Sequence, residues 1–249
     1  MIVYTVITTP DCPIPEQHHI DPSMEYVMVH TFDLDVPKPW KSFKIKEEVS
    51  PRYTFAKYQM LSHILFQEDC AWFDGKQYIL PGFYTQMLKD LEGYDCVIPM
   101  EHQRRLLLDE LVDWYLLPCI DQEGVKNVLN FLNNLNYDFT QLASCNNCAY
   151  IRKYNKNTIE HNNKWFEIWC KYKTRTQLPW LISSWLLKYN ANYVKYYPCI
   201  PRAGHQNFEW NGDIKKRRKQ LPKIVKLIKK LTNTKYILNN ANVSFRIDV

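Results

Sequence analysis

The sequence predicts an α/β fold, with helices covering both faces of a mostly parallel central sheet and a basic helix at the C-terminus. Short apolar segments with strand character alternate with longer amphipathic segments along most of the 249 residues. This alternation is typical of parallel sheets, because a crossover between parallel strands usually contains a helix. With 46% hydrophobic residues the chain is able to bury a substantial core. We expect one domain at residues 1–212 and a basic helix and tail at 213–249.

The individual elements are assigned from the spacing of apolar residues and from the turn residues between them. The expected strands are residues 1–9, 25–32, 70–73, 77–80, 94–99, 149–153 and 193–197. The expected helices are residues 53–66, 83–91, 103–115, 122–135, 162–172 and 177–189. Internal repeats, low-complexity tracts and Gly/Ser-rich linkers are absent from the sequence, which favours a single domain.

The net charge of +6 is concentrated near the C-terminus. Between Lys215 and Lys235 there are ten Lys or Arg residues and no acid, which leaves about −4 for the rest of the chain. Pro222 suits a first helical position, and apolar residues follow at helical spacing: Ile224, Leu227, Ile228 and Leu231. Such a helix can lie on an anionic membrane surface or contact nucleic acid. The narrow apolar stripe favours a third arrangement, in which the helix packs on the domain and its lysines are solvated.

The eight cysteines are scattered through apolar segments, which is typical of a reduced, cytoplasmic protein. Cys145 and Cys148 form the single C-x-x-C motif, and a structural zinc site needs two further ligands at a comparable spacing. No second pair is evident, so we interpret both as ordinary thiols. The first residues read as a strand rather than a secretory leader, and no apolar run is long enough to span a bilayer. We therefore expect a cytoplasmic location, with peripheral membrane contact through the basic helix.

The run from Asp69 to Lys76 contains the first candidate site residue. Its apolar part stops at Asp74 and Gly75, so a short buried strand delivers a carboxylate to the carboxyl edge of the sheet, where α/β folds bind ligands. The alternative is that Asp74 only opens a tight turn between two strands.

Further polar residues follow the expected strands. The strand that ends near Thr31 is followed by Asp33, whose carboxylate can accept hydrogen bonds from ribose hydroxyls or a base ring. Arg52 and Lys57 lie at the start of the next helix, where cations can meet a diphosphate. The simpler interpretation of Lys57 is a solvated surface charge.

A second group of polar residues lies after the strand at residues 94–99. His102, Arg105 and Asp109 fall on one face of the expected helix with Glu110 adjacent, so an imidazole, a guanidinium and a carboxylate can converge. The alternatives are a turn histidine and an ordinary ion pair between Arg105 and Asp109.

Several short motifs occur in a fixed order, and together they suggest a family. They are Val3-Tyr4-Thr5, the strand from Tyr26 to Asp33, Arg52 with Ala56-Lys57 and His63, Trp72-Phe73-Asp74-Gly75-Lys76, His102-Gln103-Arg104-Arg105 with Glu110, Trp165-Phe166-Glu167, and Thr174-Arg175-Thr176-Gln177-Leu178. Their order and spacing resemble the glycosyltransferase-like family of plant mucilage and pectin-related proteins, which also has bacterial and viral members. The resemblance runs from about Tyr4 to His205.

The resemblance implies a GT-A type, Rossmann-like fold and transfer of a sugar from a UDP- or GDP-sugar donor to a glycan or other hydroxyl acceptor. The residues that it implies for the donor nucleotide-diphosphate pocket are Asp33, Arg52, Lys57 and Asp74. Those that it implies around the sugar and the acceptor are His102, Arg105, Glu110, Glu167, Arg175 and Gln177. Among these, Glu110 and Glu167 are candidate catalytic bases and His102 is a candidate catalytic residue, whether the reaction inverts or retains configuration.

Two departures from the family pattern affect the chemistry. GT-A enzymes commonly bind a divalent metal through an Asp-x-Asp pair, whereas the second position here is Lys76, which repels a metal yet can neutralise diphosphate charge. If Mn²⁺ or Mg²⁺ does assist, Asp74 and His205 are its candidate ligands, although His205 is equally a plain loop residue. The family's Arg-Asp-Gln is Arg175-Thr176-Gln177 here, and Thr176 cannot act as a general base at ordinary pH.

These departures leave three functional hypotheses. A glycosyltransferase is the first, and a catalytically inactive module that binds nucleotide sugars or glycans is the second. The third is binding to nucleic acid or a membrane surface through the basic tail, with nucleic acid the weaker partner because only the tail supports it.

Overall fold

The computed structural model describes residues 1–12, 20–75, 77–100, 106–116, 120–140, 145–172, 175–196, 199–201 and 211–234. The strands are β1 (Ile2–Ile7), β2 (Glu25–His30), β3 (Lys41–Lys44), β4 (Cys70–Phe73), β5 (Gln77–Ile79), β6 (Cys96–Pro99), β7 (Ala149–Arg152), β8 (Ala191–Val194) and β9 (Cys199–Pro201). The helices are α1 (Pro51–Met60), α2 (Phe83–Asp90), α3 (Leu107–Leu116), α4 (Gln122–Asn134), α5 (Lys156–Tyr172), α6 (Gln177–Leu187) and α7 (Asn211–Thr232), with a short 3₁₀ turn at Ser62–Ile64.

The central sheet is mixed and mostly parallel, as the sequence predicts. Its strand order is β3-β2-β1-β4-β7-β6-β8, and β5 pairs with β9 in a separate small sheet. Strands β1 to β4 run parallel to one another, and β6 runs parallel to β8. Strand β7 is antiparallel to both of its neighbours, β4 and β6. The carboxyl ends of the parallel strands therefore share one edge with the beginning of β7.

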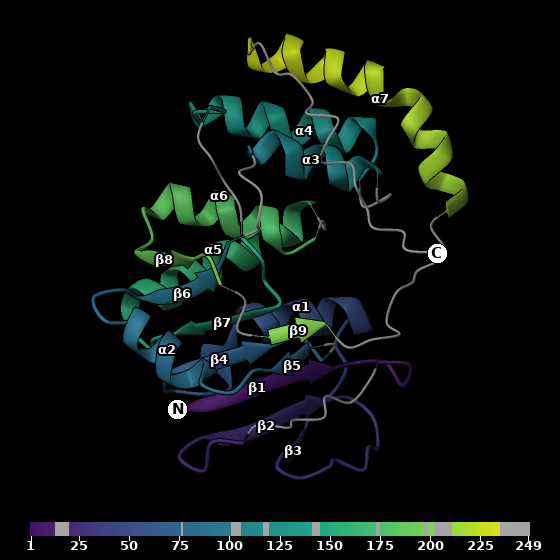
Figure 1. Cartoon of the computed structure of the whole chain (residues 1–249). Helices are drawn as coiled ribbons and strands as arrows, with labels where there is room; N and C mark the ends of the chain where they lie inside the picture. The colour runs from purple at the N-terminus through teal and green to yellow at the C-terminus, as the bar shows by residue number, and fades with distance from the viewer. Residues whose placement is uncertain are drawn as a thin grey trace.

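Both faces of the sheet are covered, because the strands are apolar on both sides. Along β1, Val3 and Ile7 belong to one buried cluster and Tyr4 and Val6 to the other. Helix α2 packs on the first face, and α1 and α3 to α7 contribute to the core on the second. Figure 1 shows α3, α4 and α7 stacked beyond α6, far from the edge formed by β2 and β3.

Several element boundaries differ from the sequence prediction. The helix expected at residues 53–66 ends at Met60, where the chain turns into the 3₁₀ segment. The helix expected at 162–172 already begins at Lys156, because the side chain of Asn155 accepts a hydrogen bond from the Thr158 N–H (2.9 Å) and caps the first turn. Strand β3 was not predicted, because its Lys-rich sequence lies exposed at the sheet edge, where charge discourages further pairing.

The basic helix α7 also begins earlier than predicted. Pro222 was expected at its first position but lies inside α7, which starts at Asn211. A proline inside a helix removes one backbone hydrogen bond and bends the axis, and Figure 1 shows α7 bent. The apolar stripe packs on the protein, since Ile224 and Ile228 are fully buried against α3 and α4. Among the described residues, no helix combines the length and apolar character needed to cross a membrane.

Candidate functional site

A cavity of about 540 Å³ opens at the carboxyl edge of the central sheet. Four segments meet there: one face of α1, the turn after β4, the loop before β7, and the region between α5 and α6. The lining residues are Arg52, Phe55, Ala56, Gln59, Asp74, Gln77, Asn146, Asn147, Cys148, Trp169, Arg175, Thr176 and Gln177.

Helix α1 lies along one wall of this cavity. Ser50 caps its N-terminus by accepting a hydrogen bond from the Tyr53 N–H (3.2 Å), and Pro51 occupies the first turn, where its missing N–H costs nothing. Arg52, Phe55 and Gln59 follow at helical spacing, so they share the face that lines the cavity.

The reversed direction of β7 explains why the Cys145 to Cys148 loop reaches this site. An antiparallel strand begins at the edge where its parallel neighbours end, so the loop before β7 meets the end of β4. The Asp74 N–H accordingly donates to the carbonyl of Cys148 (2.8 Å). Cys145 and Cys148 were predicted to be ordinary thiols, and no site role was predicted for the loop that they bound. The sequence does show two polar residues, Asn146 and Asn147, directly before a buried strand, which is a signal for a site. The direction of β7 is needed to place this pair at the carboxyl edge of the sheet.

The loop is fixed by hydrogen bonds to the protein interior. The Trp72 indole donates to the carbonyl of Asn147 (3.0 Å), and the amide of Asn147 donates to the Thr176 hydroxyl (3.3 Å). The Trp165 indole donates to the carbonyl of Thr176 (2.8 Å). Thr176 thus serves as a structural link between the loop and the start of α6.

The cavity combines positive charge with a carboxylate. The guanidinium groups of Arg52 and Arg175 come from two different elements, and Thr176 and Gln177 form the N-terminus of α6. A helix N-terminus carries partial positive charge and exposed N–H donors, so all three features favour an anion. Among the lining residues that the structure describes, Asp74 is the single acidic side chain.

Gln59 adds an unsatisfied polar group. Its side chain is 3% exposed, and its Oε1 has no hydrogen-bond partner within the described part of the chain. Burying an unpaired amide oxygen costs about 1 to 3 kcal/mol, and because this oxygen is itself fully buried, it lowers stability behind the cavity wall and is not an exposed acceptor for a ligand.

Four predicted site residues are brought together by the fold. Arg52 and Asp74 were assigned to the donor pocket, and Arg175 and Gln177 to the sugar and acceptor; all four line the same cavity. Asp74 also opens the turn before β5, since its carbonyl accepts from the Gln77 N–H (3.0 Å). The turn interpretation and the site interpretation of Asp74 are therefore both compatible with its position.

Two other predicted donor-pocket residues lie outside the lining of the cavity. The Lys57 ammonium pairs with Glu48 (2.7 Å), whose pKa is lowered mainly by this hydrogen bond. The Asp33 carboxylate is almost fully exposed and pairs with Lys44, which lowers its pKa. Their roles toward a nucleotide stay predictions.

The predicted catalytic glutamates are also outside the lining. Glu110 is 6% exposed in the first turn of α3, beside the buried Leu107 and Leu111. Glu167 is exposed on α5 and pairs with Lys164. Their catalytic roles stay predictions.

Lys76, His102, Arg105 and His205 lie outside the described residues. Among the residues that the structure describes, no group of three or more His, Cys, Asp or Glu side chains is arranged to hold a metal ion. Asp74 and His205 therefore remain untested as metal ligands.

Comparison with known proteins gives no further assignment. The sequence matches no model of a known protein family. It also has no match among the curated proteins searched.

Proposed function

We propose that this protein is a GT-A-like glycosyltransferase that binds a UDP- or GDP-sugar in the cavity at the carboxyl edge of the sheet. The observation that supports this most directly is the convergence of Arg52, Arg175 and the N-terminus of α6 beside Asp74. A leaving nucleoside diphosphate needs positive charge as the glycosidic bond breaks, and preorganised donors supply it. The sequence resemblance adds the sugar-transfer chemistry.

The sheet gives this proposal a second support. Ligands bind α/β folds at the carboxyl ends of the strands, where Asp74 follows β4. In this proposal, Asp74 accepts a hydrogen bond from a ribose or sugar hydroxyl.

Binding of the nucleotide is the first test. Isothermal titration calorimetry of the full chain with UDP and with GDP, each in EDTA and in Mn²⁺, should detect binding of one of the two nucleotides. Arg52→Ala and Arg175→Ala should each weaken binding about tenfold or more, because a hydrogen bond to a charged group contributes about 1.5 to 3 kcal/mol. Arg218→Ala, on the exposed side of α7, is the matched control and should bind as the parent does. If the protein binds neither UDP nor GDP, the proposal is wrong.

A non-catalytic module that binds nucleotide sugars is the second candidate, and the positions of Glu110 and Glu167 outside the cavity lining favour it. Donor hydrolysis and transfer separate the two. In a transferase, at least one of Glu110→Gln and Glu167→Gln should lower turnover about 10²- to 10⁴-fold with nucleotide binding retained, because loss of a general base has an effect of this size. A parent that binds sugar nucleotides and turns none over is a binding module.

A further inference from the structure

A second hollow lies between α4 and the end of α5, with a volume of about 650 Å³. This size is in the range of small-molecule sites. Its lining residues are Asp121, Glu123, Gly124, Asn127, Asn130, Phe131, Asn134, Lys171 and Tyr172. We call this hollow the α4–α5 groove.

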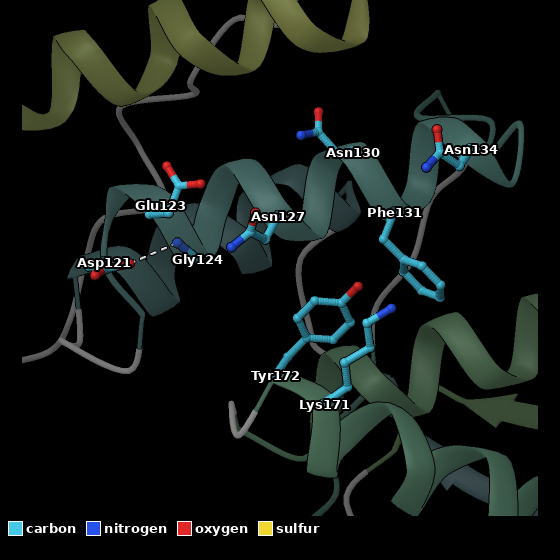
Figure 2. A pocket seen from close by; sticks show the side chains of 9 residues that line it. All are labelled: Asp121, Glu123, Gly124, Asn127, Asn130, Phe131, Asn134, Lys171 and Tyr172. Atoms are coloured by element: carbon cyan, nitrogen blue, oxygen red, sulfur yellow. Dashed lines mark hydrogen bonds between the residues drawn. The ribbon is translucent and has the colours of Figure 1, made fainter.

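The α4 side of the groove is rich in amides. Asn127, Asn130 and Asn134 recur at helical spacing, are exposed, and lie on the face that also carries Phe131. Figure 2 shows Phe131 directed toward α5 and Asn127 on the side of α4 that faces α5, whereas Asn130 points away from α5. Each amide offers both donors and an acceptor, which is the pairing that vicinal hydroxyl groups need.

Both helices supply aromatic surface, Phe131 from α4 and Tyr172 from α5, and α5 adds two hydrogen-bond donors. The rings of Phe131 and Tyr172 are 5.5 Å apart, and the Lys171 ammonium lies 4.7 Å from the Phe131 ring centre. Burial raises the pKa of Tyr172 to about 12, so its hydroxyl remains a donor at neutral pH. Apolar ring surface surrounded by amides, a hydroxyl and an ammonium matches a pyranose, which has an apolar C–H face and a rim of hydroxyls.

The charges of the groove argue against an anionic ligand. Lys171 is its single cation and Asp121 and Glu123 are its carboxylates, among the described lining residues. Phosphate or nucleic acid would meet net negative charge here. A neutral, hydroxyl-rich ligand avoids this repulsion and uses the same carboxylates as acceptors.

The last turn of α5 connects this groove to the sheet-edge cavity. Trp169 lines that cavity, and Tyr172, three residues later, lines the groove. Residues at this spacing are neighbours on a helix surface. The two hollows therefore approach each other at the last turn of α5.

We propose that the α4–α5 groove binds a neutral saccharide and, where the proposed function holds, that this saccharide is the acceptor. Asn127 and Tyr172 are its central hydrogen-bonding residues, and Phe131 supplies the apolar surface.

Direct saccharide binding tests this proposal without any catalytic readout. The full chain, free of nucleotide, would be applied to an array of defined neutral oligosaccharides of glucose, galactose, mannose, xylose and N-acetylglucosamine. The tightest binder would then be titrated by calorimetry. Asn127→Ala and Tyr172→Phe should each weaken this binding about fivefold or more, consistent with the loss of a hydrogen bond to the ligand. Tyr172→Phe retains the ring, so a folding defect is not expected to account for the loss.

Asn163→Ala is the matched control, because Asn163 is an exposed asparagine of α5 outside the groove lining. It should bind the saccharide as the parent does. If the parent binds no neutral saccharide, or binds one with no loss in either groove variant, the proposal is wrong. The nucleotide titration is independent: a chain that binds nucleotide but no saccharide overturns this inference alone. A chain that binds saccharide but no nucleotide overturns the proposed function and, with it, the acceptor role.

Discussion

At the scale of single residues, the buried Arg152 makes four side-chain hydrogen bonds to distant parts of the chain. Its side chain is 1% exposed, and its guanidinium donates to the carbonyls of Gln59 (2.7 Å) and Met60 (3.1 Å). It also donates to the hydroxyl of Tyr4 (2.6 Å) and the amide oxygen of Asn162 (2.7 Å). Gln59 and Met60 are the last residues of α1, where the helix dipole is negative. Arg152 therefore anchors the end of the helix whose other part lines the cavity.

Replacing Arg152 with Met should destabilise the protein strongly. Removal of the guanidinium leaves several buried acceptors without their donor, at about 1 to 3 kcal/mol each. We expect a loss of at least about 3 kcal/mol in the free energy of unfolding, measured by urea denaturation. Arg218→Met, at an exposed position of α7, is the control and should change stability by less than about 0.5 kcal/mol. Similar losses for the two variants would contradict the anchoring role.

At the scale of elements, α7 combines a buried stripe with a basic outer surface. Its apolar residues pack against α4 and α3. Arg217 adds hydrogen bonds to the carbonyls of Tyr115 (2.7 Å) and Ile120 (2.6 Å). The stripe is therefore not available for insertion into a lipid bilayer while the helix is docked. Peripheral membrane contact through the lysines remains a prediction and would be purely electrostatic.

Ile228→Ala tests the docking of α7. The side chain is fully buried against the core, and shortening a buried Ile to Ala typically costs about 2 to 5 kcal/mol. The neighbouring Lys229→Ala changes an exposed side chain of the same helix and should have little effect. Both free energies come from urea denaturation, and equal stability of the two variants would mean that α7 is not docked in solution. Truncation before Lys215 would remove the buried Ile224 and Ile228 and should therefore destabilise the whole protein.

At the scale of the whole molecule, stability should depend on pH through buried histidines. His161 is fully buried, its ring stacks on Tyr189 (4.0 Å), and its Nε2 lies 2.9 Å from the Ser184 hydroxyl. Burial, reinforced by the nearby Arg152 charge, lowers the pKa of His161 to about 3. Burial likewise lowers the pKa of His63. Below the ordinary histidine pKa of about 6.5, these histidines bind protons in the unfolded chain but stay neutral in the native state.

The free energy of unfolding should therefore fall as the pH decreases from about 6.5 toward 5. Each such histidine contributes at most about 1.4 kcal/mol per pH unit. His161→Gln removes one such titrating group, so the free energy of unfolding should change with pH by up to about 1.4 kcal/mol less per pH unit than in the parent. The variant's stability at pH 7 is compared separately. Urea denaturation at pH 7, 6 and 5 measures the slope, and an unchanged slope would contradict a neutral native His161. The ionised Glu48 also stabilises the native state, because its pKa is lowered there. This stabilisation is lost only as the pH falls below the ordinary glutamate pKa, so it does not affect the slope between pH 7 and pH 5.

Part of the candidate site was predictable because strand ends can be located from apolar patterning. Asp74 follows a short apolar run, and Arg52 begins the preceding helix, so both were assigned to the correct edge of the sheet. Lys57 shows the limit of this reasoning. Its helical position was nearly correct, but the partner that it contacts, Glu48, lies in a loop that periodicity does not place.

The alternating α/β pattern, the two-sided burial of the sheet and the apolar stripe of the basic helix could all be predicted from the sequence, because each depends on local periodicity. The antiparallel direction of β7, the separate pairing of β5 with β9 and the contact of Asn147 with Thr176 became evident only in the folded structure. It also decided the α4–α5 groove, whose two sides come from helices separated along the chain. The physical reason is that hydrogen-bond direction and helix docking are set by contacts between distant segments, and residue spacing carries no information about them.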